Sequence, residues 1–127
     1  MPALTSNGKV IVVSPLVEVS GTTPEVIFQC MPPYMKYIIR KLIIYNKDSA
    51  DHEVVLGAYN TTASSWSEDK LIYKVAAGET LILTEKELPR DFVMTSDPAT
   101  AIMAWAAKLD AAVTANNVYV KAEFEVA

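Results

Sequence analysis

The residues whose types and spacing best suit chemistry lie in the segment DSADHE, residues 48–53. Asp48, Asp51 and Glu53 place carboxylates around His52, the only histidine of the chain, and such a set is able to bind a divalent metal. The segment lacks the glycine and the terminal glutamate of a calcium-binding loop, and it has no second histidine. Strand-forming residues flank it on both sides, so we predict a solvated hairpin loop that holds no metal.

Nucleophilic catalysis has little support in the sequence. Cys30 is the only cysteine, which excludes an internal disulfide and a zinc site built on thiolates. It lies in the apolar stretch VIFQCM, where a lone cysteine is typically a small buried hydrophobic residue. The four glycines are isolated, so neither a phosphate-binding loop nor a nucleophile elbow is present. We therefore predict a protein that is not an enzyme and has no cofactor, with an enzyme that uses a pair of carboxylates as an alternative.

Charge and hydropathy narrow the choice of partners. The net charge is −4, and the only basic cluster is KYIIRK, residues 36–41, so we expect no nucleic-acid partner. We also expect neither a secretory signal nor membrane insertion, because no basic segment precedes a long apolar core and no apolar run approaches about 18 residues. Yet 51% of the residues are hydrophobic. This excess is explained either by a large monomeric core or by surface buried between subunits.

The elements that must position these residues are predicted to be β-strands in a single domain, residues 1–127. Runs rich in Val, Ile and Tyr alternate with turn-forming segments at the spacing typical of a sandwich or barrel. The expected strands cover residues 9–20 with a break at Pro15, 24–31, 37–45, 53–59, 71–84 with a turn at AAGE, and 116–126. The proline-containing segment 31–35 is predicted to be irregular, and residues 61–70 to be a polar loop.

Three of these segments carry specific expectations. Residues 37–45 and 53–59 are predicted to pair as a hairpin around the polar loop between them. Residues 71–84 are predicted to form a second hairpin or a corner, in which Gly78 takes a positive φ. Residues 116–126 alternate apolar and polar side chains, which is the clearest pattern in the chain for a strand with one buried face.

The segment 97–114, DPATAIMAWAAKLDAAVT, has two interpretations. Its alanine content and the Asp-Pro start favour a helix, with apolar residues on one face. The need of the last strand for an antiparallel neighbour favours a strand over residues 102–107. In that strand Ala104 and Ala106 would pack inward, leaving Met103 and Trp105 on a face that a neighbouring subunit covers.

A resemblance bears on this choice. The runs KLIIYNKDSADHEVVLGAY, LIYKVAAGETLILT and TAIMAWAAKLDAAVTANNVYVKAEFEV resemble small β-sandwich structural proteins of phages and related virus particles. Such proteins typically show a strand and loop of the form lxvyNxs, an aGetxxl turn and a closing hairpin. The resemblance covers residues 36–126 and implies an all-β, jelly-roll-like antiparallel sandwich of about eight strands, in which residues 102–107 pair with residues 118–126.

The resemblance also implies a function. We expect a non-enzymatic virion structural protein, a capsid-decoration or tail-associated subunit made in the host cytoplasm, whose partners are copies of itself and other virion proteins. The candidate subunit-interface residues are Met31, Tyr34, Met35, Trp66, Met103 and Trp105. For Trp105 we expect a place in the core, or between subunits if Ile102 points inward. For Trp66 the alternative is a loop held on its own domain. The alternative function is a module that binds a sugar or another small ligand on Trp66 or Tyr59.

Overall fold

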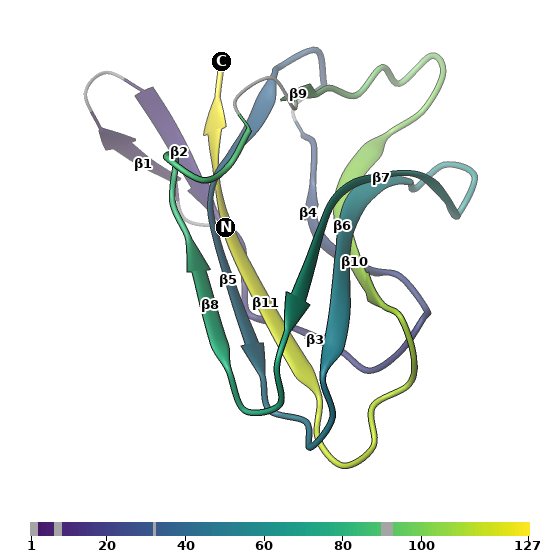
Figure 1. The fold of residues 1–127 in the computed structure, drawn as a ribbon. Helices are drawn as coiled ribbons and strands as arrows, with labels where there is room; N and C mark the ends of the chain where they lie inside the picture. The colour runs from purple at the N-terminus through teal and green to yellow at the C-terminus, as the bar shows by residue number, and fades with distance from the viewer. Residues whose placement is uncertain (1–2, 7–8, 32, 90–92) are drawn as a thin grey trace.

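The structure is a computed structural model that describes residues 3–6, 9–31, 33–89 and 93–127. Within these ranges all regular structure is β, and no helix is long and apolar enough to cross a bilayer. The strands are β1 (Ala3–Ser6), β2 (Lys9–Val13), β3 (Val17–Val19), β4 (Glu25–Gln29), β5 (Tyr37–Asn46), β6 (His52–Asn60), β7 (Ser65–Val75), β8 (Thr80–Leu83), β9 (Val93–Met94), β10 (Met103–Leu109) and β11 (Val118–Val126). They form two antiparallel sheets packed face to face (Figure 1), which confirms the predicted β-sandwich.

The order of the strands is that of a jelly roll. The larger sheet has the order β1-β2-β11-β5-β8, with β3 also on β11 and β9 also on β5, and the smaller sheet has the order β4-β10-β6-β7. β2 and β3 lie along the same side of β11, with Pro15 in the break between them, and β8 and β9 likewise lie along one side of β5. When each of these pairs is counted as one interrupted strand and β1 is set aside, eight strands remain, in the orders 1-8-3-6 and 2-7-4-5. This is the connectivity of the jelly roll.

Two predicted strand pairings are wrong. β5 and β6, expected to form a hairpin, lie in opposite sheets. The resemblance implied a strand in place of a helix after residue 102, and residues 103–109 do form the strand β10. This strand pairs with β4 and β6, however, and not with β11 as predicted. In both cases the connecting loop crosses between the sheets, because the apolar faces of the two strands are buried against each other across the core instead of side by side.

The smaller sheet ends in a strand that is longer than the sequence predicted. Residues 65–70, expected to be loop, form the first half of β7, an eleven-residue edge strand on β6 whose register shifts twice. Most of these side chains are exposed, so the segment has no apolar alternation, and backbone pairing alone makes it a strand. The turn after β7 leads into the other sheet and is therefore a corner, in which Gly78 has the predicted positive φ of 76°.

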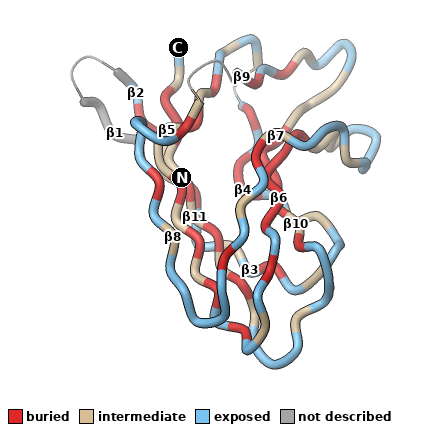
Figure 2. Tube along the Cα trace, in the orientation of Figure 1, coloured by how far each residue is buried: buried red, intermediate tan, exposed pale blue. Residues whose placement is uncertain are grey.

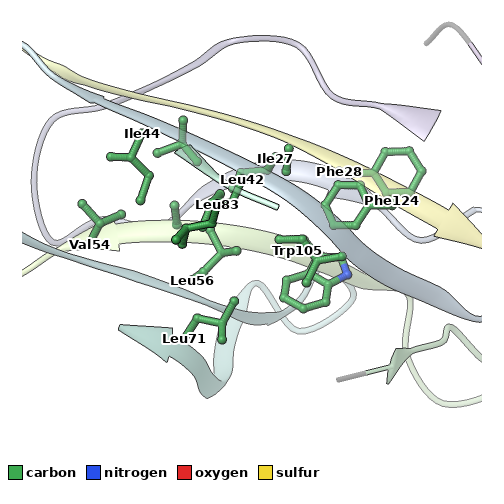
Figure 3. Close-up of a cluster of buried hydrophobic side chains, with 14 of the residues drawn as sticks. Ile27, Phe28, Leu42, Ile44, Val54, Leu56, Leu71, Leu83, Trp105 and Phe124 are labelled. Atoms are coloured by element: carbon green, nitrogen blue, oxygen red, sulfur yellow. The ribbon is translucent and has the colours of Figure 1, made fainter. Parts of the chain in front are cut away.

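The core lies between the sheets (Figure 2), and aromatic rings fill one part of it (Figure 3). The Phe124 ring centroid is 5.2 Å from that of Phe28 and 5.6 Å from that of Trp105. Trp105 is 0% exposed, and its indole Nε1 has no hydrogen-bond partner among the described residues, so this side chain contributes through its apolar area. The predicted orientation of β10 is therefore wrong: Trp105 faces the interior of its own chain, and the alanines 104 and 106 lie on the other face.

Candidate functional site

Two of the residues expected to be chemically competent, Asp48 and His52, are buried and form a link with Asp110 at one end of the sandwich. His52 is 3% exposed; its Nε2 lies 2.7 Å from Oδ2 of Asp48, and its Nδ1 lies 3.0 Å from Oδ1 of Asp110. Asp48 is in the connection after β5, His52 begins β6 and Asp110 follows β10, so the link joins two loops that cross between the sheets. The prediction of a solvated loop is wrong for Asp48 and His52, whereas Asp51 and Glu53 are exposed as expected.

The Asp48 carboxylate also holds the loop that precedes β11. It accepts hydrogen bonds from the backbone N–H groups of residues 114, 115 and 116, at 2.9, 2.8 and 3.2 Å. A buried carboxylate is stable only when such donors and a cation satisfy its oxygens. The residue therefore holds together the loops 47–51 and 110–117.

The electrostatics of the link favour a charged imidazolium between two carboxylates. Burial by itself lowers the pKa of His52, but the hydrogen bonds and charges of Asp48 and Asp110 outweigh it, and the net pKa is raised. The His52 hydrogen bond lowers the pKa of Asp48 well below its usual range, against the opposing effect of burial and with help from the backbone donors. Burial by itself raises the pKa of Asp110. The hydrogen bond and charge of His52 and the backbone donors outweigh this effect, so the net pKa of Asp110 is lowered.

This arrangement is suited to structure and not to catalysis. Both nitrogens of His52 are engaged, so neither is available to take a proton from a substrate. The carboxylates of Asp48 and Asp110 lie at opposite nitrogens of the ring and do not converge on one point. Consistent with this geometry, no group of three or more His, Cys, Asp or Glu side chains within the described ranges is placed to hold a metal ion.

Asn46 adds a second buried link at the same end. Its Nδ2 donates to the backbone oxygens of residues 50, 75 and 76 at 3.0, 2.9 and 3.2 Å, and its Oδ1 accepts from the N–H of Asp48 at 3.0 Å. The side chain is 1% exposed. It thereby joins the end of β5 to the end of β7 in the opposite sheet. In the sequence, the only sign of this role is that a polar residue ends an apolar strand.

We call this region the polar end; it comprises the connections 20–24, 47–51, 76–79 and 110–117, at the bottom of Figure 1. Cys30 lies away from it, at the end of β4, and is fully buried as predicted. Burial raises the pKa of its thiol to about 12. At neutral pH the thiol is therefore protonated and is no nucleophile.

Four of the six candidate interface residues lie at the opposite end, which we call the apolar end. It comprises the described residues of 30–36, 61–64 and 84–102, a range that includes β9, together with Met103 at the start of β10. The N–H of Cys30 donates to the carbonyl oxygen of Met103 at 2.9 Å, and Ser96 links Met103 to the backbone of Tyr34. The side chains of Met35 and Met103 are half-buried against the core. Those of Met31 and Tyr34 project to solvent, 47% and 69% exposed.

Tyr34 is held in an unusual backbone conformation. Its φ of 66° lies in the left-handed region, which is uncommon for a tyrosine. The N–H of Tyr34 donates to the carbonyl oxygen of Ser96 at 2.9 Å, and its hydroxyl donates to Asp97 at 3.2 Å. Val93, 40% exposed, belongs to the same end. Strain of this kind at an exposed aromatic residue is typical of recognition sites.

The remaining two candidates do not belong to this surface. Trp105 is in the core, as expected for this residue when it does not lie between subunits. Trp66 is half-buried on the outer face of the smaller sheet, with its Nε1 donating to Asp69 at 2.8 Å and the Lys108 ammonium 4.2 Å from its ring centroid. A Cβ atom at Gly57 would collide with the Trp66 ring, so the glycine is what allows this close packing. Trp66 is thus held on its own domain.

A feature that the sequence analysis missed lies on the outer face of the larger sheet. Tyr45 and Tyr119 face each other across β5 and β11, and with Leu16, Lys47 and Lys121 they line a surface hollow of about 480 Å³. The alternation in residues 116–126 had already placed Tyr119 and Lys121 on the solvent side. Nothing in the sequence placed Tyr45 opposite Tyr119, because that contact depends on the register between distant strands.

Comparison of the sequence with models of known protein families and with curated proteins gives no match. A proposal for function therefore depends on this geometry and on the resemblance described for residues 36–126.

Proposed function

We propose that this protein is a non-enzymatic structural subunit that associates with copies of itself through its apolar end. The observation that carries the proposal is that three exposed large hydrophobic side chains, those of Met31, Tyr34 and Val93, belong to segments at one end of the sandwich. Methionine and tyrosine are enriched in the cores of protein–protein interfaces. An exposed side chain of this kind costs solvation free energy in a free monomer, and a partner surface removes that cost.

The location and hydrogen-bond partners of the titratable groups support a structural role over an enzymatic one. In the polar cluster with altered pKa values, Asp48 and His52 are buried, and the members of the cluster bind one another and the backbone. Perturbed groups in an enzyme lie in a cleft that a substrate reaches. Here the groups with altered pKa values instead join the loops 47–51 and 110–117, which is a structural role.

The place of the subunit in a virus particle is part of the proposal. It is supported by the resemblance of residues 36–126 to phage structural proteins and by the jelly-roll connectivity, which is common in capsid proteins. The second support is an analogy at the level of fold, since jelly rolls also occur in lectins and in other proteins. On this proposal, other virion proteins are further partners.

The test is the solution mass of the purified protein, measured by light scattering across a dilution series. We expect a discrete oligomer for the unchanged chain and a monomer for the double variant Met31→Ser, Tyr34→Ser. The matched control is Ile72→Ser, which removes a comparably exposed apolar side chain from β7 and should leave the oligomer intact. A monomeric wild-type protein at all concentrations, or equal loss of mass in the control, would overturn the proposal.

A further inference from the structure

The outer face of the larger sheet carries a concave surface near the polar end. The hollow of about 480 Å³ lies within the size range of small-molecule sites, about 300–1,000 Å³. A second hollow of about 280 Å³ adjoins it, lined by Asn46, Gly78, Glu79 and Thr80 and sharing Tyr45 and Lys47 with the first. Because they share these two residues, the hollows lie side by side, and we call the pair the groove.

Two phenol rings form the floor of the larger hollow. Tyr45 and Tyr119 are directly opposite in the register of β5 and β11, and the neighbouring side chains Ile44, Val118 and Val120 are in the core. The tyrosines therefore face outward, and both are half-buried. Held by the sheet, they offer an apolar surface with a polar tip, at little cost in conformational entropy on binding. Leu16, 52% exposed, extends the apolar surface.

Two unpaired cations border this aromatic floor. Lys47 follows β5 and Lys121 lies in β11, and in the described part of the chain neither ammonium group has an ion-pair partner. The chain as a whole has a net charge of −4. Two free ammonium groups in one hollow of an acidic protein favour an anionic ligand by charge complementarity.

Carboxylates at the margin limit which anion fits. Glu18 lies opposite Tyr119 in the register, Glu123 follows Lys121 two residues later on the same face, and Glu79 lines the second hollow. A nucleic-acid strand carries a charge on every residue and requires a track of cations, which these carboxylates interrupt. An acidic saccharide carries isolated charges between hydroxyl groups. Its hydroxyls donate hydrogen bonds to carboxylates, and its apolar ring face stacks on tyrosine.

We propose that this groove binds an acidic saccharide, with a carboxylated or sulfated sugar ring on Tyr45 and Tyr119, its negative group between Lys47 and Lys121, and a neighbouring sugar in the hollow beside Thr80. The site is independent of the apolar end, so the subunit is able to assemble and bind the saccharide at once. The aromatic platform differs from the one considered from the sequence, because Trp66 is held against Gly57 and Lys108.

The test is an NMR titration of the isotope-labelled full chain with four separate probes: 3′-sialyllactose, 3′-sulfolactose, lactose and a short thymidine oligonucleotide. We expect saturable shifts of the amide signals of residues 45, 47, 119 and 121 with at least one acidic saccharide. Lactose, which lacks the charge, should bind about tenfold more weakly, the equivalent of one charge-assisted hydrogen bond. Stronger binding of the oligonucleotide than of both acidic saccharides would contradict the proposal.

Variants test the assignment residue by residue. Lys121→Gln should weaken binding of the acidic saccharide about tenfold, while Tyr119→Phe should retain most of it because the ring is preserved. Lys74→Gln is the matched control, since it removes an exposed lysine from β7 in the other sheet. Failure of both acidic saccharides to shift the wild-type signals, equal binding of lactose, or equal weakening in the control would each overturn the inference. None of these outcomes bears on the oligomeric mass, which tests the apolar end.

Discussion

Both ends of the sandwich contain loops that cross from one sheet to the other, and the apolar end also holds the hairpin 61–64 between β6 and β7. The two ends differ in what holds their loops. At the polar end, the side chains of Asn46, Asp48 and His52 turn inward and bind backbone groups and one another. At the apolar end, Met31 and Tyr34 turn outward. Loops at a protein surface usually show the reverse arrangement, with polar groups in water and apolar groups inside.

The two ends contribute to different properties of the protein. The polar end is complete within one chain, since its buried groups find their partners there. The apolar end leaves surface that a second chain is able to cover. The polar end should therefore determine the stability of the monomer, and the apolar end should determine its association with a second chain. Substitutions at one end, each compared with a matched change elsewhere in the chain, separate these two roles.

The largest effect is expected for His52→Ala. The substitution leaves the carboxylates of Asp48 and Asp110 without their cation, and breaking a buried ion pair in this way costs about 3–5 kcal/mol in the free energy of unfolding. Urea unfolding measures it. The control is Glu53→Ala, an exposed neighbour, which should change stability by no more than about 0.5 kcal/mol. Similar values for the two variants would mean that the link does not hold this end.

A smaller loss is expected for Asn46→Ala. The substitution removes the amide that satisfies three backbone oxygens, and leaving buried groups unpaired costs about 2 kcal/mol. Asn117→Ala is the control, because the Asn117 amide makes one exposed hydrogen bond, to Glu18 at 3.3 Å. Urea unfolding of both variants should show a clear loss only at position 46. Equal losses of stability in the two variants would show that the buried hydrogen bonds of Asn46 do not stabilise the fold more than the exposed one of Asn117.

The polar end should also make stability depend on pH, with a smaller effect. The pKa of His52 is raised on folding, so its contribution is full below its ordinary value of about 6.5 and is lost as the pH rises through the folded-state pKa. The pKa values of Asp48 and Asp110 are lowered, so their contribution is present above about 3.9 and is lost as the pH falls through the folded-state values. The link is therefore strongest between these limits.

Unfolding midpoints measured across this range check the prediction. The wild-type protein should lose stability as the pH rises above about 6.5, and the variant His52→Gln, which has no titrating ring, should lack that part of the decline. Parallel curves for the two proteins on the alkaline side would show that His52 does not titrate between the two states as described.

The smallest effect on the monomer is expected at the apolar end. Tyr34→Gly relieves the positive φ and removes the hydrogen bond to Asp97, two changes that oppose each other, so stability should change by less than about 1 kcal/mol. The same variant should weaken self-association, as measured by light scattering. A large loss of monomer stability would show that Tyr34 serves the fold of its own chain, and the contrast between the two ends would fail.

Several features could be predicted from local sequence because they depend on local physics. The alternation in residues 116–126 identified the buried face of β11, since side chains of a strand point alternately to its two faces. The break at Pro15 and the positive φ of Gly78 followed from the backbone limits of those residue types. The apolar neighbours of Cys30 correctly indicated its burial. The all-β class was likewise evident from the residue types and their spacing.

The partners of each strand were decided only by the tertiary structure. A loop between two strands has a similar composition whether it makes a hairpin or crosses the core, so neither the β5–β6 nor the β10–β11 arrangement could be read locally. The burial of Asp48 and His52 depended on Asp110 and on the loop 110–117, which lie far along the chain. The hollow between Tyr45 and Tyr119 arose in the same way, from the register of two distant strands. A local pattern determines which face of a strand is buried, whereas long-range packing determines what is buried against it.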